Sequence, residues 1–81
     1  MTKQSVKVGT TEVFIAPTEA EDGSFVASAR GKSQDQTFGP QDWTDPRVRT
    51  DAARVICEAF GLTRNNQNMT KVAKAIDAAM E

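Results

Sequence analysis

The 81-residue chain contains no histidine and only one cysteine, Cys57. The lack of histidine removes the most common general base and the most common metal ligand of proteins. One cysteine forms neither an internal disulfide nor a cysteine-rich zinc site, and a nucleophilic thiol needs a neighbouring base or strong local positive potential. We therefore expect Cys57 to be structural, in a protein that is not an enzyme and carries no metal or cofactor.

Long hydrophobic runs are absent as well. No segment has the length needed to cross a bilayer, and the first residues, MTKQSVKVG, lack the apolar stretch of a signal peptide. A lone cysteine also fits a reducing compartment. The expected location is the cytoplasm, that of the host cell if the protein is phage-encoded, with no membrane partner.

Aromatic residues are scarce. The chain has four phenylalanines, one tryptophan and no tyrosine. Large rings supply much burial for few residues, so we expect each to anchor part of a small core. Trp43 has two interpretations, as a core anchor beneath the first helix or as an interface residue, and it stays among the candidate partner-binding residues.

The chain has almost no excess of charge of one sign, with a formal net charge of −1. Residues 1–45 carry four basic and seven acidic side chains, a net of −3, and residues 46–81 carry six basic and four acidic, a net of +2. Glu19, Glu21 and Asp22 crowd one predicted loop. This loop is either a solvated turn or a negative patch that meets a basic partner.

The N-terminal third alternates apolar and polar residues, which is typical of half-buried strands. The pairs Gly9-Thr10 and Asp22-Gly23 suit the turns between them. We predict a three-stranded antiparallel β-meander over residues 4–9, 11–16 and 24–30. Residues 36–38 fit a loop or a short edge strand, and we count them with the loop.

The remainder predicts two helices, over residues 46–60 and 69–80. Asp45 suits the cap of the first helix and Pro46 its first position, and Gly61 suits its stop. Asn68 suits the cap of the second. Cys57 is expected nearly opposite the centre of the first helix's apolar face, which holds Val48, Ala52, Val55, Ile56 and Ala59. The predicted fold is α+β, a single domain with both helices packed on one face of the sheet.

The stretch LTRNNQNMTK, residues 62–71, allows two interpretations. A helix beginning at Arg64 would resemble a helix-turn-helix and present side chains that can bond to base edges. It would also place Asn65 and Asn66 on the buried face and set several asparagines in a helix, which costs about 2 kcal/mol for three of them. Basic residues are interspersed with acidic ones, so electrostatic binding to nucleic-acid phosphates would be weak. We favour a loop that ends at Asn68.

A compact domain without catalytic groups most often works by binding. The candidate surfaces are the acidic loop, the polar segment that follows the third strand, Trp43 beside it, and the loop before the second helix. The candidate partner-binding residues are Glu19, Glu21, Asp22, Arg30, Lys32, Asp35, Trp43, Arg64, Asn65 and Asn66.

Two segments carry a resemblance to a known group. VFIAPTEAEDGSFVASARGKS is a predicted hairpin closed by an acid-Gly turn, and DPRVRTDAARVICEAFG is the helix after it. This layout resembles that of some small phage-encoded anti-CRISPR proteins, over most of the chain, and carries over no residue role. It implies binding to a CRISPR surveillance or nuclease complex that blocks DNA entry or nuclease recruitment, with the acidic loop as a substitute for DNA phosphates.

We therefore predict a small non-enzymatic protein-binding inhibitor whose partner is a protein or a nucleoprotein complex, with anti-CRISPR activity as its specific form. One alternative is a small DNA- or RNA-binding protein that uses the basic C-terminal helices. Another is a self-associating structural phage protein. It would form a homodimer through the small residues Ala53 and Cys57, over which two helices can approach closely.

Overall fold

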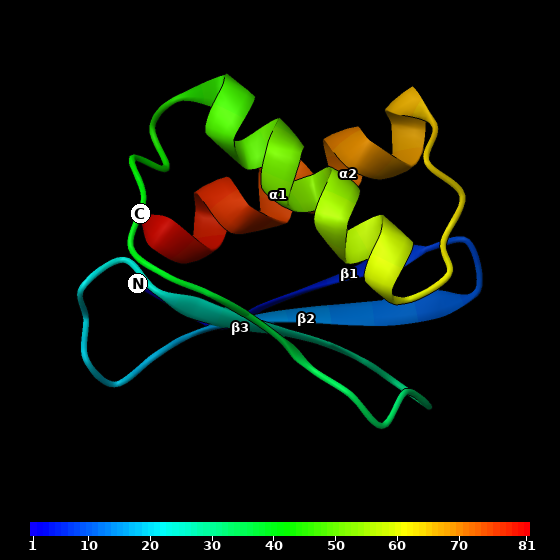
Figure 1. Ribbon diagram of the computed structural model, residues 1–81, viewed down its shortest axis with the longest axis horizontal. Coiled ribbons are helices and arrows are strands. Elements are labelled where there is room, and N and C mark those ends of the chain that lie inside the picture. The colour runs from blue at the N-terminus through cyan, green and yellow to red at the C-terminus, as the bar shows by residue number, and fades with distance from the viewer.

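The computed structural model describes all 81 residues as two layers, an antiparallel sheet and a pair of helices (Figure 1). The predicted α+β fold is confirmed. The elements are β1 Gln4–Val8, β2 Thr11–Pro17, β3 Phe25–Ala29, β4 Gln36–Phe38, α1 Pro46–Ala59 and α2 Asn66–Met80.

The sheet has four strands in the order β1-β2-β3-β4, so the predicted meander gains a short edge strand. Phe38 pairs with Phe25 and Thr37 with Val26 in the β3–β4 register. Three residues are too few to show an alternating pattern in a sequence. Pairing with β3 makes this segment a strand, which is why the sequence alone left it in the loop.

Both helices cover the same face of the sheet, as predicted, and the opposite face is open (Figure 1). Alternation along each strand sends one set of side chains toward the helices. In β2 this set is Val13 and Ile15, and both are fully buried. The buried residues of the sheet are Val8, Val13, Ile15, Phe25, Ala27 and Ala29.

The open face carries one aromatic residue, Phe14, which corrects the expectation that every ring anchors the core. Its side chain is only partly buried. Lys3 places its Nζ 5.3 Å from the ring centroid and Arg30 places its guanidinium carbon 5.9 Å from it. These cations cover an aromatic surface that no other layer covers.

The buried face of α1 is rotated from the predicted one. Ala53 and Cys57 are fully buried, whereas Val55 is 41% exposed. Arg49 lies one turn before Ala53 on the same stripe, and it forms an ion pair with Asp77 of α2 at 3.7 Å. The stripe of small residues therefore faces α2. Because α1 packs against α2 as well as the sheet, Ala53 and Cys57 are covered within the chain and do not form the exposed strip of small residues that a homodimer through them would use.

α2 begins at Asn66, three residues before the predicted start. Asn65, not Asn68, is the cap, and its side-chain oxygen accepts the Asn68 amide at 2.8 Å. The Asn68 side chain in turn donates to the Thr63 carbonyl at 2.8 Å. Asn65 and Asn66 are both exposed. The first turn of α2 is solvated, so the Asn65 and Asn66 side chains are not buried and the expected cost of burying them does not arise.

Candidate functional site

A cleft of about 450 Å³ opens at one end of the molecule, where segments distant in sequence meet. Its walls come from the β2–β3 loop, the segment before α1 and the C-terminal end of α2, and Met1 also lines it. Met1, Trp43 and Met80 are its apolar lining residues, and no lysine or arginine lines the cleft. We call this site the acidic cleft, because its lining includes the carboxylates of Glu21, Asp22, Asp42, Asp77 and Glu81.

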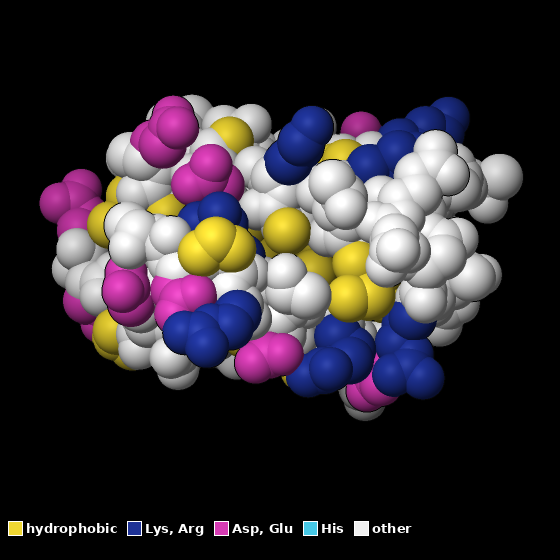
Figure 2. All heavy atoms as spheres, turned by 90° about the horizontal axis from the view of Figure 1, so that it is seen from above, with side chains coloured by type: hydrophobic (Ala, Val, Ile, Leu, Met, Phe, Trp, Pro, Cys, Tyr) yellow, Lys and Arg dark blue, Asp and Glu magenta, His cyan; other side chains and the backbone are white.

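The charge of the molecule is divided between its two ends. Figure 2 shows acidic side chains gathered mostly at the left end and basic ones mostly toward the right. The left end corresponds to the end of Figure 1 at which the β2–β3 loop and the chain termini lie. A net charge of −1 for the whole chain therefore hides a local negative field.

The β2–β3 loop is held in shape by its own hydrogen bonds. Thr18 and Ser24 close it, with a backbone bond of 3.1 Å and a hydroxyl–hydroxyl bond of 2.7 Å. Asp22 accepts from both the amide and the hydroxyl of Ser24. Glu21 adopts φ +54° and Gly23 φ +91°, left-handed conformations that turn the chain back toward β3. The loop is thus an ordered turn whose acidic side chains stay in solvent.

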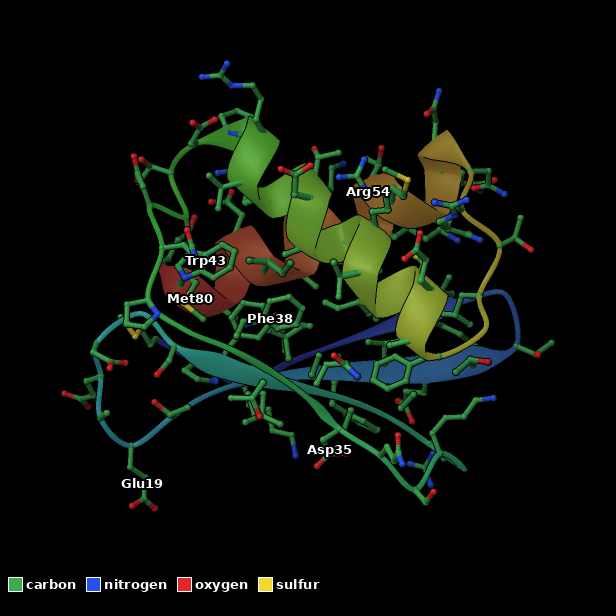
Figure 3. The ribbon with its side chains drawn as sticks, in the orientation of Figure 1. Glu19, Asp35, Phe38, Trp43, Arg54 and Met80 are labelled. Atoms are coloured by element: carbon green, nitrogen blue, oxygen red, sulfur yellow. The ribbon has the colours of Figure 1, made fainter.

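A hydrogen bond from Trp43 joins this loop to the segment before α1. The indole Nε1 donates to the Gly23 carbonyl in a buried position. The indole also packs on Phe25, with ring centroids 5.0 Å apart and a tilt of 59°. Trp43 is only 6% exposed, which confirms its interpretation as a core anchor. Its ring forms the floor of the acidic cleft beside Met80 (Figure 3).

Two carboxylates of the cleft have pKa values lowered from that of an ordinary aspartate. The Ser24 hydroxyl, and then the Ser24 amide, lower the pKa of Asp22. The Thr44 hydroxyl, and then the Thr44 amide, lower the pKa of Asp42 in the same way. Hydrogen bonds donated to a carboxylate favour its charged form. These two side chains therefore hold their negative charge more firmly than an aspartate without such bonds.

The structure brings together only part of the predicted site. Glu21, Asp22 and Trp43 line the cleft, whereas Glu19 points away from the protein body into solvent (Figure 3). Asp35 is exposed just before β4, at a distance along the sheet from the cleft (Figure 3). These acidic residues therefore divide into a cleft group and two separate surface positions.

The predicted basic and amide residues lie outside the cleft. Arg30 pairs with Glu12 at 3.0 Å, and Lys32 is exposed after the turn at Gly31. Arg64 pairs with Glu58 at 2.6 Å and so ties the α1–α2 connection to α1. Asn65 caps α2 and Asn66 is its first residue. These side chains have local structural partners or solvent around them, and none faces the cleft.

Three cleft carboxylates were not predicted as part of a site. Asp77 lies in the last turn of α2 and Glu81 is its C-cap, four residues further on, and this spacing was the available signal. Asp42 lies in an Asp-Trp-Thr turn in which its side chain accepts the Thr44 amide at 3.2 Å. Nothing in the sequence places these residues beside the β2–β3 loop, since only tertiary packing does so.

No three His, Cys, Asp or Glu side chains stand together in an arrangement that could hold a metal ion. Cys57 is fully buried, and burial raises the pKa of its thiol. Neither helix combines the length and hydrophobicity needed to span a bilayer. What the surface offers is shape, negative charge and a small apolar floor.

Comparison with known proteins found no matching family model, no matching curated protein and no matching solved structure. A function for this chain is therefore inferred from its own fold and surface.

Proposed function

We propose that the protein is a small non-enzymatic binding protein whose acidic cleft engages a basic surface of a protein or nucleoprotein complex. The observation that carries this proposal is the cleft lining, which holds the side-chain carboxylates of five residues and no lysine or arginine. Of these five carboxylates, that of Asp77 is paired with Arg49 at 3.7 Å. Like charges on the lining of one cleft repel, so a partner that supplies Lys or Arg relieves that repulsion on binding.

The apolar floor of the cleft adds to this attraction. Met80 is partly buried and the Trp43 ring lies beside it (Figure 3). Exposed ion pairs by themselves contribute about 0–1 kcal/mol each, so charge alone gives weak binding. A long Lys or Arg side chain that reaches this floor would bury its aliphatic stem there and keep its charged head among the carboxylates.

The specific form of the proposal is inhibition of a host CRISPR effector complex by a phage-encoded protein. Its support is the resemblance in layout to small phage-encoded anti-CRISPR proteins together with the acidic cleft. CRISPR effectors hold nucleic acid in positively charged channels. An acidic end that occupies such a channel would exclude DNA from it. Since the net charge is only −1, the cleft and not the whole surface would act in place of DNA phosphates.

The test is DNA binding and cleavage by purified CRISPR surveillance and nuclease complexes, with and without the protein. We expect one class of complex to lose DNA binding and the loss to weaken as salt rises. Failure to bind or inhibit any such complex rejects the specific form. The broader proposal then rests on native mass measurement of complexes with other candidate partners.

Charge reversal localises the interaction. Glu21→Lys changes a cleft carboxylate that is exposed and has no hydrogen bond or ion pair within the protein. Asp35→Lys makes the same change of charge outside the cleft and is the matched control. We expect Glu21→Lys to weaken binding about tenfold and Asp35→Lys to leave it within about twofold. Equal effects of the two variants would mean that the cleft is not the site.

The basic C-terminal helices support the nucleic-acid alternative less well. Four of the six basic residues of positions 46–81 lie 2.6–3.7 Å from a carboxylate of the same protein. Such pairing reduces the positive field available to phosphates. A gel shift at low salt that disappears with Lys71→Ala and Lys74→Ala would favour this alternative over the acidic cleft.

A further inference from the structure

The sheet ends in an edge strand, β4, whose outer side has no partner. The direction of its free backbone groups follows from the ladder between β2 and β3. The Arg30 amide donates to the Glu12 carbonyl at 2.9 Å, and the Thr18 amide donates to the Ser24 carbonyl at 3.1 Å. Every second residue of an antiparallel strand bonds to the same neighbour. The even-numbered residues along β3 therefore bond to β2.

The odd-numbered residues of β3 then bond to β4. Phe25 faces Phe38 and Ala27 faces Gln36, so these residues of β4 direct their backbone groups toward β3. Thr37, between them, directs its N–H and C=O to the open edge. An added strand would find one backbone donor and one acceptor at the centre of β4.

An apolar groove of about 270 Å³ lies beside this edge, between β4 and α1. Val55 is 41% exposed on its α1 wall, and Phe38 projects toward the helices from β4 (Figure 3). Asp51 is the only charged residue of the lining. We call this site the β4 groove, and its lining is Phe38, Gln41, Trp43, Val48, Asp51, Ala52 and Val55.

The opposite edge of the sheet differs. β1 contains Lys7 and is preceded by Lys3, and both side chains are exposed. Lysines on an edge strand oppose pairing with another chain. β4 contains no charged residue, since its sequence is Gln-Thr-Phe. Of the two edges, β4 alone combines an uncharged strand with an apolar groove beside it.

We propose that the β4 edge and the β4 groove bind an extended segment of a partner protein as a fifth strand. The segment bonds to the Thr37 backbone and places an apolar side chain in the groove against Val55. A basic side chain of the segment near Asp51 would share that carboxylate with Arg54, which lies 2.8 Å from it. Strand addition of this kind draws affinity from main-chain hydrogen bonds and specificity from pockets for alternate side chains. The inference does not depend on the acidic cleft, which lies on the other side of Trp43.

An extended segment fits this surface better than a second copy of the chain. A standard protein–protein interface uses roughly 20–30 residues on each side, whereas the groove has seven lining residues and β4 has three residues. Two folded copies that meet edge to edge would bury too little surface for a stable dimer. An extended peptide can follow both the edge and the groove.

The probe is a capped, fluorescein-labelled peptide of alternating valine and threonine with a lysine at each end. Binding is measured by fluorescence anisotropy, and the contact is located by the NMR shift of the Thr37 amide. We expect binding that is lost when the peptide is N-methylated on the residues that face β4. Absence of binding, or binding that N-methylation leaves intact, overturns the proposal.

Variants identify the surface. Thr37→Pro removes the free donor and spares the bonds to β3, and edge strands tolerate proline. We expect about tenfold weaker binding, whereas Thr37→Val, which keeps the donor, binds as the parent does. Val55→Lys blocks the groove at an exposed position and provides a second route if Thr37→Pro fails to fold. Equal peptide binding by the parent and by Val55→Lys would overturn the proposal. A dimer of the parent in sedimentation that Thr37→Pro dissociates would also overturn it, because the edge would then pair with a second copy.

The experiment also separates this inference from the proposed function. Glu21→Lys alters the acidic cleft alone and should leave peptide binding unchanged. Val55→Lys alters the groove alone and should leave inhibition through the cleft unchanged. Each proposal can therefore fail without the other.

Discussion

Replacing Trp43 by phenylalanine removes the hydrogen bond that joins two walls of the acidic cleft. The indole Nε1 donates to the Gly23 carbonyl, and this contact is buried. Phenylalanine keeps an aromatic ring against Phe25 but has no donor to replace the indole N–H. The β2–β3 loop would then lose its side-chain link to the segment before α1.

The expected cost combines two effects. A buried carbonyl that loses its partner costs about 1–3 kcal/mol. Because the phenylalanine ring is smaller, the variant also loses about 1 kcal/mol of hydrophobic stabilisation, the value for one or two buried methylene groups. The sum is about 2–4 kcal/mol. A domain of 81 residues has a total stability of about 4–12 kcal/mol, so the variant loses a large share of it.

Guanidinium unfolding followed by far-ultraviolet circular dichroism measures this loss, because the variant has no tryptophan fluorescence. In a thermal melt, a loss of about 2 kcal/mol in the free energy of unfolding lowers Tm by about 8–16 °C for a domain of this size. Amide exchange should also accelerate in residues 19–24. Gln41→Ala is the control, since Gln41 is an exposed neighbour without a side-chain hydrogen bond, and it should change stability by less than about 0.5 kcal/mol. If Trp43→Phe changes stability as little as the control does, the buried hydrogen bond does not join the cleft walls.

Three further predictions concern the cap of α2, the thiol and the low-pH behaviour. Asn65→Ala should cost about 1 kcal/mol in thermal unfolding, while Asn66→Ala, one residue further and exposed, should cost nothing; equal losses would contradict the assignment of Asn65 as the cap. Cys57 should react with an aromatic disulfide reagent only in denaturant, because it is fully buried and its thiol pKa is raised; rapid reaction of the native protein would show that α1 and α2 separate. Asp22 and Asp42 have lowered pKa values, so their contribution to stability is present above the unfolded pKa of 3.8 and is lost as the pH falls through their folded pKa values. In thermal melts, the double variant Asp22→Asn/Asp42→Asn should therefore lose less stability than the parent when the pH is lowered past 3.8.

Local signals in the sequence determined most of the secondary structure. Alternation of apolar residues predicted β1, β2 and β3, and the pair Asp45-Pro46 located the start of α1 correctly. These signals act within a few residues, through side-chain direction and capping, so they can be recognised in the sequence alone. The β2–β3 turn was predicted for the same reason, since its bonds join residues at most six positions apart.

Competing local signals misplaced the start of α2. Both Asn65 and Asn68 are good caps, and the choice depends on whether the intervening turn is buried. The structure leaves that turn in solvent, so the helix extends back to Asn66. Propensity by itself could not make this choice, because the cost of asparagine in a helix is smaller than the effect of burial.

Tertiary structure alone decided which surfaces exist. The stripe with Ala53 and Cys57 resembles an exposed strip of small residues when α1 is taken by itself, and it becomes buried because α2 packs on it. In the same way, β4 becomes a strand only beside β3, and Asp42 and Asp77 join Glu21 only when the chain ends are brought together. The sequence by itself determined which segments are strands and helices, because those preferences are local. The acidic cleft and the open β4 edge depend on contacts between residues far apart in the chain, which no local pattern records.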